Sequence, residues 1–270
     1  MFNYSFKPDF GKKLQLFKKY GFDYIHWCDD WNNDVFYEPK DIKFYTQLVE
    51  SLGLKCLDVH GTATESIRID AEEQDALNMY IKLLKNRIEF CATIGGDAVV
   101  IHPPNDKNGS EQLQQKLDRS LKVFECVRPL CEANGVTLAI ENCYPSDEKI
   151  LKYYFKKYPP DFVCFCFDSG HANVNKNLDT LLKFGDRLRV LHLHDNKGEK
   201  DDHQPPFWGT INWEEVMQWI MKSSYSKPIN FEIMHSSKLF DGSMEDFMEY
   251  SVRSIRKLIQ ENWRTKQPET

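Results

Sequence analysis

Nine side chains of the types that bind divalent metals stand where apolar runs of this sequence give way to polar loops. They are His60, His102, Glu141, Asp168, His171, His192, Asp201, His203 and Glu232. Mixed imidazole and carboxylate donors are typical ligands of Zn²⁺, Mn²⁺ and Co²⁺. The set therefore predicts one divalent metal site, assembled from distant parts of the chain.

The elements that must position these residues alternate between strand and helix. The predicted strands are Phe2–Phe6, Asp23–Trp27, Lys55–His60, Asp97–His102, Val136–Glu141, Val163–Asp168, Arg189–His194 and Pro228–Ile233. Segments with helical apolar spacing lie between them, notably Pro39–Leu52, Asp70–Ile94, Ser110–Ala133, Trp213–Ser223 and a last one from Ser243 to about Trp263. Alternating strands and helices without a linker predict a single domain over residues 1–270, an α/β protein with a (β/α)₈ TIM-barrel fold.

The order of side chains within the strands predicts that the ligands face the barrel interior. Alternate residues of a strand point to opposite faces, and the smaller set of each strand suits a crowded interior. In the strand 136–141, Thr137 and Ala139 share their face with Glu141. The same parity holds in five further strands, which carry His60, His102, Asp168, His192 and Glu232 at or near their ends. Carboxylates and imidazoles gathered there need partners or a cation, because burial disfavours isolated charges.

Taken one at a time, these residues have ordinary explanations. His60 or His102 alone would be a hydrogen-bonded structural histidine, and Glu141 could accept hydrogen bonds in a turn. Asp168 opens a common turn sequence, and Asp201 lies in a charged run that could be a solvated loop. The parity that the strands share favours one metal site over these separate explanations.

Composition limits the class of protein. The net charge of −6 argues against a general nucleic-acid surface, although it leaves room for a local basic pocket. The chain has no run of about 18 apolar residues, and its first residues lack the order of a signal peptide, so we expect a cytoplasmic protein that does not enter a membrane. The 8 cysteines are scattered without a C-x-x-C pair and are expected to be reduced.

Several segments together resemble a known family. They are VVIHPP, LAIENCYP, FDSGHAN, LHLHDNKGEKDDHQPPFWGTINW and PINFEI. They are similar to the xylose isomerase-like TIM-barrel superfamily, which contains sugar phosphate isomerases and epimerases, hexulose epimerases, inosose dehydratases and endonuclease IV (AP endonuclease family 2). The resemblance covers nearly the whole chain and is most specific in the long segment that begins at Leu191.

The resemblance implies how the ligands are divided. The metal common to the superfamily would be held by Glu141, Asp168, His192 and Glu232, with His192 preferred over His194 because it matches the first residue of the family's H-x-x-D pattern. In endonuclease IV two further zinc ions are bound. The positions matching those sites here are His60 and His102, which would share Glu141, and a second group of His171, Asp201 and His203. The resemblance therefore implies one to three ions.

The resemblance also implies a reaction. A sugar or sugar phosphate would bind the metal through neighbouring oxygens, and an enediolate would form when the adjacent carbon loses its proton. Glu141 and Glu232 would be the catalytic groups: epimerisation if they act on opposite faces of the sugar, isomerisation if one base acts alone. His171 and His194 are expected to bind substrate hydroxyls or to move protons.

One segment departs from the family pattern. Relatives commonly have a small, glycine-containing loop where this chain has Pro205-Pro206-Phe207-Trp208-Gly209. Phe207 and Trp208, together with Trp27 at the end of the second predicted strand, could form a stacking wall for a sugar, or the loop could be a packed lid. The departure leaves the substrate unassigned.

Two other classes of function stay open. A phosphodiester hydrolase such as an apurinic endonuclease is favoured by the nine matched positions, whereas the acidic balance and His102-Pro103-Pro104 in place of the endonuclease-like H-P-G argue against a nucleic-acid partner. A barrel that keeps the ligands only for stability is the other, and a related inosose dehydratase would use the same site. The sequence leaves the oligomeric state open, a homo-oligomer included.

Overall fold

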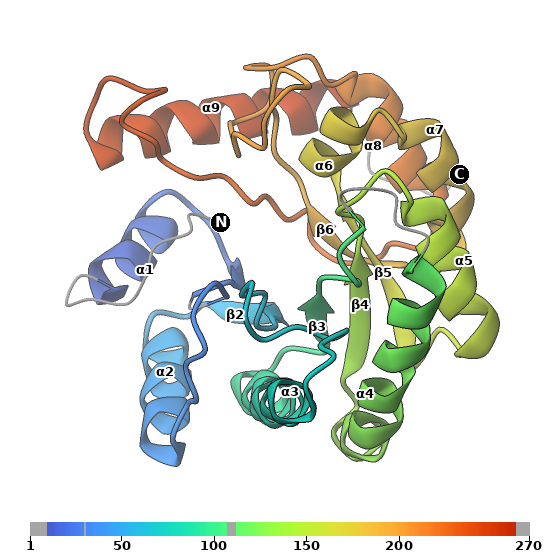
Figure 1. Ribbon diagram of the computed structural model, residues 1–270. Coiled ribbons are helices and arrows are strands. Elements are labelled where there is room, and N and C mark those ends of the chain that lie inside the picture. The colour runs from blue at the N-terminus through green and yellow to red at the C-terminus, as the bar shows by residue number, and fades with distance from the viewer. Residues whose placement is uncertain (1–9, 30, 107–111, 263–270) are drawn as a thin grey trace, which may run out of the picture.

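The computed structural model describes residues 10–29, 31–106 and 112–262. Six parallel strands form one curved sheet in the order of the chain (Figure 1). They are β1 (Tyr24–Trp27), β2 (Lys55–His60), β3 (Ala98–Ile101), β4 (Thr137–Glu141), β5 (Val163–Asp168) and β6 (Leu188–His192). Parallel strands that neighbour each other in both sequence and space are typical of the predicted α/β barrel.

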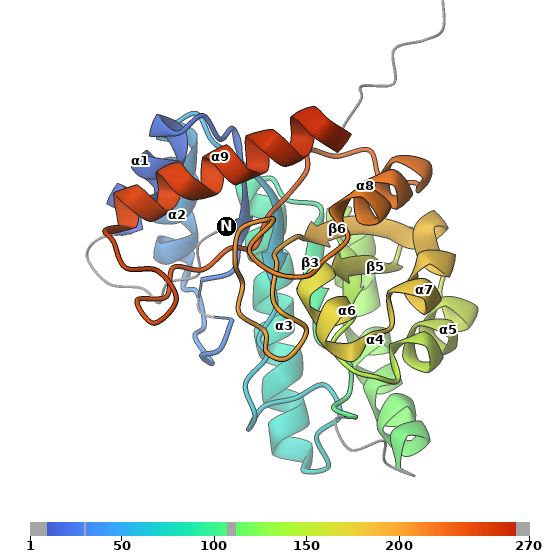
Figure 2. The ribbon, with the colours of Figure 1, turned by 90° about the horizontal axis from the view of Figure 1, so that it is seen from above.

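Helices cover the outer face of this sheet (Figures 1 and 2). They are α1 (Phe10–Lys19), α2 (Pro39–Ser51), α3 (Gln74–Ile94), α4 (Leu113–Asn134), α5 (Asp147–Lys157), α6 (Ser169–Asn175), α7 (Leu178–Leu181), the 3-10 helix η1 (Leu182–Arg187), α8 (Trp213–Lys222) and α9 (Met244–Asn262). The last helix returns to the first, since Lys19 Nζ lies 3.4 Å from Glu245 Oε2. Among the described residues, no helix combines the length and apolarity needed to cross a membrane.

Glycines end two of the long helices and set the start of the strands that follow. Gly95 closes α3 with φ of 93°, and Gly135 closes α4 with φ of 64°. Both are left-handed conformations that a residue with a Cβ rarely adopts. Because β3 and β4 begin within three residues of these turns, the glycines fix which side chains reach the far end of each strand.

The predicted strands agree closely with the structure, with one correction. Lys55–His60 and Val163–Asp168 coincide with β2 and β5, whereas Phe2–Phe6 lies outside the described residues. Pro228–Ile233 does not form a regular strand: a single parallel bridge joins Phe231 to Leu193. In the part of the chain that the structure describes, nothing pairs with its other edge, so the ladder stays short. The bridge still places Glu232 beside the end of β6.

Two apolar layers confirm the predicted parity in β3, β4, β5 and β6. Small side chains fill the interior of the curved sheet: Ala98, Val100, Ala139, Cys164, Cys166 and Val190. The bulky residues of the same strands pack outward against the helices, as Leu138, Ile140 and Phe165 do. All eight cysteines are free in the structure.

Candidate metal centre

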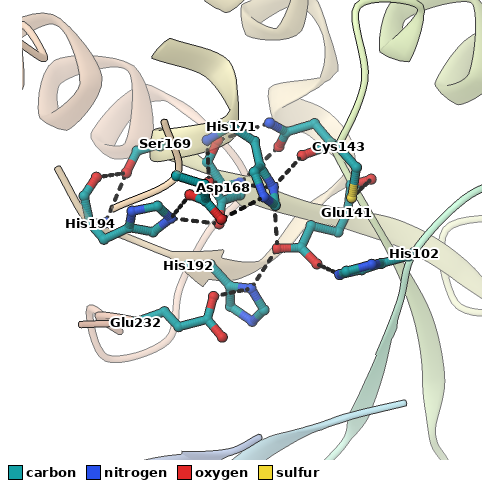
Figure 3. Close-up of polar contacts among 12 residues, drawn as sticks. His102, Glu141, Cys143, Asp168, Ser169, His171, His192, His194 and Glu232 are labelled. Atoms are coloured by element: carbon teal, nitrogen blue, oxygen red, sulfur yellow. Dashed lines mark hydrogen bonds and ion pairs between the residues drawn. The ribbon is translucent and has the colours of Figure 1, made fainter. Parts of the chain in front are cut away.

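Histidines and carboxylates gather at the carboxyl ends of the strands, where the curved sheet opens (Figure 3). All nine predicted ligands belong to one network of close contacts. Seven of the eight histidines of the chain take part in it, the exception being His235. The structure thus brings together residues that span positions 26 to 232 of the sequence.

Glu141 lies at the centre of the network. It ends β4 and is only 1% exposed. Its Oε1 lies 2.8 Å from His192 Nδ1, and its Oε2 lies 3.0 Å from His102 Nε2 and 3.5 Å from His60 Nε2. The carboxylate therefore links the end of β6 to the ends of β2 and β3. Burial alone would raise the pKa of Glu141, but the neighbouring His192 and His102 hold it well below its usual range.

The four residues proposed from the resemblance form one ligand group. Donor atoms of Glu141, Asp168, His192 and Glu232 all lie within 4.8 Å of one another, and all four residues are buried. His192 Nδ1 contacts Glu232 Oε2 at 3.1 Å as well as Glu141. Three carboxylates around one imidazole carry an excess of negative charge, which burial makes costly without a cation. This donor set fits a divalent metal ion.

A second group surrounds Asp201 on the loop after β6. Asp201 Oδ2 lies 2.9 Å from His203 Nε2 and 3.2 Å from His171 Nε2. Its Oδ1 lies 3.5 Å from His194 Nε2, and the rings of His194 and His203 stack with centroids 4.0 Å apart. The structure therefore adds His194 to the set predicted from His171, Asp201 and His203.

The loop after β6 folds back on itself to deliver Asp201 and His203. Asp195 and Gln204 exchange two backbone hydrogen bonds of 2.7 and 2.9 Å. His203 adopts a positive φ of 48°, which is uncommon for a residue other than glycine. Its backbone oxygen accepts a hydrogen bond of 2.9 Å from Met234 N, so the loop is tied to the residue two positions after Glu232.

Backbone carbonyls orient three of the imidazoles. The Nδ1 atoms of His60, His171 and His203 lie 2.7, 2.9 and 3.1 Å from the oxygens of Gly61, Asn142 and Glu232. A carbonyl oxygen only accepts, so each Nδ1 carries the ring proton, and a neutral ring presents its Nε2 lone pair to a carboxylate. Two lone pairs facing each other repel unless a proton or a metal ion lies between them.

Without a metal ion, protons would lie between the imidazole nitrogens and the carboxylate oxygens of the Asp201 group. Burial opposes a charge on His203, but the Asp201 carboxylate outweighs it and raises the pKa of His203 to about 9. In the same way burial opposes a charge on His171, and Asp168 and Asp201 raise its pKa well above the usual value. The site therefore holds positive charge in either state.

The segment after β5 is shaped to hold Asp168 in place. The side-chain amide of Asn142 donates to the backbone oxygen of Asp168 at 2.8 Å and accepts from the backbone N–H of Asp168 at 2.7 Å. One Asp168 carboxylate oxygen caps α6 by accepting from His171 N at 2.6 Å, and the other lies 3.0 Å from His194 Nε2. A Cβ at Gly170 would lie 1.9 Å from His194 Cε1, so only glycine fits between them.

The aromatic residues proposed as a sugar-stacking wall lie elsewhere. Trp27 is 2% exposed, and its Nε1 donates to Tyr37 Oη at 3.0 Å in the layer between sheet and helices. The Lys257 ammonium lies over the Phe207 ring, and Trp208 packs on Tyr250 at 5.0 Å. These contacts favour the packed-loop interpretation, because Lys257 and Tyr250 belong to α9.

Trp31 takes the position that Trp27 was expected to fill. Its ring lies 5.6 Å from that of His60 and 5.9 Å from that of His102. A cavity of about 420 Å³ opens here, within the size range of small-molecule pockets. Its lining includes Trp31, Thr62, Arg68, His102, Tyr144 and His171. The Arg68 guanidinium is held by Asp70 at 2.6 Å.

Sequence reasoning missed His26, which reaches the site from β1. Its ring lies 4.3 Å from the ring of His192, and its Nδ1 hydrogen-bonds Asp58. Burial lowers the pKa of His26 and outweighs the neighbouring Asp58. Parity could have found it, because His26 must point opposite to the apolar Ile25 and Trp27 within the predicted strand.

Sequence comparison finds curated relatives over much of the chain. The chain is 31% identical over 246 residues to the uncharacterized protein y4fM of Sinorhizobium fredii, which covers 81% of this chain and 79% of that protein. It is 24% identical over 172 residues to the probable endonuclease 4 of Bacillus subtilis, covering 55% and 56% of the two chains.

Solved structures share the fold. A D-psicose 3-epimerase from Clostridium cellulolyticum H10, solved with D-tagatose, matches with a TM-score of 0.76 at 13% identity over 98% of this chain and 99% of that one. An IolI protein with a bound zinc atom matches with a TM-score of 0.74 at 16% identity and the same coverage. The sequence model of one family, described as the xylose isomerase-like TIM barrel, matches residues 14–258. The chain belongs to this family.

Proposed function

We propose that this protein is a metal-dependent isomerase or epimerase of sugars or sugar phosphates. The observation that carries the proposal is the placement of Glu141 and Glu232 on two sides of His192 Nδ1, at 2.8 and 3.1 Å. The nine predicted ligands at the carboxyl ends of the strands are here named the rim. Glu141 ends β4 and Glu232 lies beyond β6, so the two carboxylates approach the site from different parts of the rim. Structural neighbours that are sugar epimerases support the same class of reaction.

Glu141, Asp168, His192 and Glu232 would hold the metal ion. A divalent ion bound there supplies positive charge that stabilises the anion formed when a carbon beside a carbonyl loses its proton. The zinc-bound structural neighbour supports a divalent ion in this fold. Hydrogen bonds within the protein orient the ligands: Asn142 fixes the position of Asp168 through two of them.

Glu141 and Glu232 would remove and return the proton. Burial would raise the pKa of Glu232, but His192 holds it well below its usual range, as it does that of Glu141. Both groups are therefore ionised at neutral pH and able to accept a proton. Use of both carboxylates on opposite faces of a sugar would give an epimer, and use of one would give an aldose–ketose pair.

The cavity beside the rim would receive the substrate. His102 and His171 line it from the side of the metal centre, and Trp31 supplies an apolar face. His171 is only 19% exposed at its side chain, so it would contact the part of the sugar nearest the metal. We propose that His171 binds a hydroxyl of the substrate. His194 is fully buried and does not line the cavity, so its predicted contact with the substrate stays a prediction.

A phosphodiester hydrolase is the second candidate, and a specific arrangement favours it. Donor atoms of His60, His102 and Glu141 form a second group within 4.8 Å that shares Glu141 with the first, so the rim offers more than one metal position. The similarity to the probable endonuclease 4 of Bacillus subtilis supports the same candidate. The net charge of −6 opposes it, because DNA binding rewards a basic surface.

One screen separates the candidates. The protein, loaded with Mn²⁺, Co²⁺ or Zn²⁺, is incubated in D₂O with a panel of ketoses, their phosphates and inososes. We expect deuterium at one carbon of at least one substrate, with the product distinguishing isomerase, epimerase and dehydratase. An oligonucleotide with an abasic site is incubated in parallel. Cleavage of that oligonucleotide without deuterium uptake from any sugar would overturn the proposal in favour of the hydrolase.

A further inference from the structure

His26 and Asp58 form a buried pair beneath the rim. They come from opposite positions of β1 and β2 in the sheet register and are 0% and 2% exposed. Their hydrogen bond joins His26 Nδ1 to Asp58 Oδ1. Neither residue belongs to the ligand sets considered above, and neither lines the cavity.

The pair leaves the other ring nitrogen of His26 facing the metal centre. Because the Asp58 carboxylate accepts at Nδ1, that atom carries the ring proton and Nε2 presents a lone pair. His26 Nε2 is buried, has no hydrogen-bond partner, and lies 4.0 Å from Glu232 Oε1. An unshared lone pair opposite a carboxylate oxygen is unfavourable in a buried site unless a cation lies between them.

His192 completes the arrangement. Its Nδ1 faces Glu141 and Glu232, whereas its Nε2 is buried and also lacks a hydrogen-bond partner. Donor atoms of His26, His192 and Glu232 lie within 4.8 Å of one another. Glu232 divides its oxygens between the two groups, with Oε2 toward His192 Nδ1 and Oε1 toward His26.

We propose that His26, His192 and Glu232 form an additional divalent cation position, here named the floor position. Two imidazoles and one carboxylate are a donor set that zinc takes in proteins. Asp58 acts as the positioning residue, because its carboxylate fixes the tautomer and the direction of the His26 ring. The inference rests on the metal centre of the proposed function and adds a position beneath it.

The floor position shares two residues with the upper set of Glu141, Asp168, His192 and Glu232. If both were filled, His192 and Glu232 would serve both ions, and any ring proton displaced from His192 would pass to solvent. Occupation of the floor position therefore holds both shared ligands in a fixed orientation for the chemistry above.

Metal content measures the floor position without any substrate. Wild type, His26→Gln, Asp58→Asn and the control His235→Gln are dialysed against Zn²⁺, and bound zinc is counted by elemental analysis. We expect His26→Gln to lose about one ion per chain, and Asp58→Asn to bind that ion about 10- to 100-fold more weakly. His235→Gln should match wild type, because His235 belongs to none of the five candidate ligand groups found among the described residues.

An anomalous-scattering map of wild-type crystals grown with Zn²⁺ gives a second measurement that needs no variant. A zinc peak bonded to His26 Nε2 is expected. If His26→Gln folds with the full zinc content, or if the map shows zinc only at the upper set, the floor position is overturned and the proposed function stands. Absence of zinc from both positions would contradict the proposed function as well. Should His26→Gln fail to fold, the map decides.

Discussion

The two ends of the same parallel strands carry charged clusters of opposite character. At the amino ends, Asp97 lies 3.0 Å from Arg189 Nη2 and also pairs with Lys227, so two cations surround one carboxylate. These side chains are 17–40% exposed, and water screens their charges. At the carboxyl ends, the carboxylates of Glu141, Asp168 and Glu232 are buried and face imidazole nitrogens.

The difference indicates which of the two clusters requires a bound cation. The Asp97 cluster is complete as it stands and needs no further ion. The rim holds three buried carboxylates around His192, an arrangement that becomes favourable only when cations occupy it. In barrels of this type activity belongs to the carboxyl ends of the strands and stability to the amino ends.

The largest effect is expected from Glu232→Gln at the rim. The amide keeps the size of the side chain but removes its charge and its ability to accept a proton, so kcat/KM should fall about 1000-fold. Zinc content is measured on the same sample to separate loss of metal from loss of the base. Glu261→Gln on the exposed end of α9 is the matched control. Activity within about threefold of wild type in Glu232→Gln would remove Glu232 from the mechanism.

The second-largest effect is expected from removal of the metal ion from the rim, which should lower the stability of the protein. An ion present at about 1000 times its dissociation constant stabilises the folded state by about 4 kcal/mol. Chelation followed by dialysis should therefore lower the melting temperature, and added Zn²⁺ should restore it. Asp97→Asn should show the same dependence on metal as wild type, since its cluster lies at the other end of the strands. A melting temperature indifferent to chelator would argue against a resident ion.

The pH dependence of stability should reverse between the metal-free and metal-bound proteins. In the metal-free protein the pKa of His203 rises from 6.5 unfolded to about 9 folded, so its stabilising effect is complete below 6.5 and is lost as pH rises through about 9. The metal-bound protein needs deprotonated ligands, so its stability should rise over the same interval. Urea titrations at pH 6.5 and 9 measure both. Parallel curves for the two states would contradict metal binding by the Asp201 group.

The smallest effect is expected at the amino ends. Asp97→Asn removes two partly exposed ion pairs, with Arg189 and Lys227, that together are worth about 1 kcal/mol or less, and activity should not change. Urea unfolding together with the deuterium-exchange assay checks both statements. A loss of activity in this variant would show that the two ends of the barrel are coupled. That result would contradict the assignment of stability to the amino ends and activity to the carboxyl ends.

Alternation of strands and helices predicted the fold, and strand parity predicted most of the rim, because both patterns are local properties of the sequence. It placed Glu141, Asp168 and His192 at the ends of β4, β5 and β6, and their contacts agree with it. The same rule, applied to β1, would have exchanged Trp27 for His26. An aromatic residue at a strand end was instead read as part of the site, although it packs against the helices.

The remaining features depend on long-range contacts that a single sequence does not encode locally. His194 joins Asp201 only because the loop after β6 folds back through the Asp195–Gln204 pairing and the positive φ of His203. The short ladder at Phe231 reflects the absence of a second partner among the described residues. Trp31 reaches His60 and His102 through a loop without regular structure.

Metal-dependent exchange of one carbon-bound proton with solvent tests the central claim most directly. The substrate found in the screen is followed in D₂O with three samples: the metal-loaded protein, the same protein after chelation, and that sample after metal is restored. We predict deuterium uptake in the first, its loss in the second and its return in the third. Exchange that continues at full rate in the chelated protein would contradict the account.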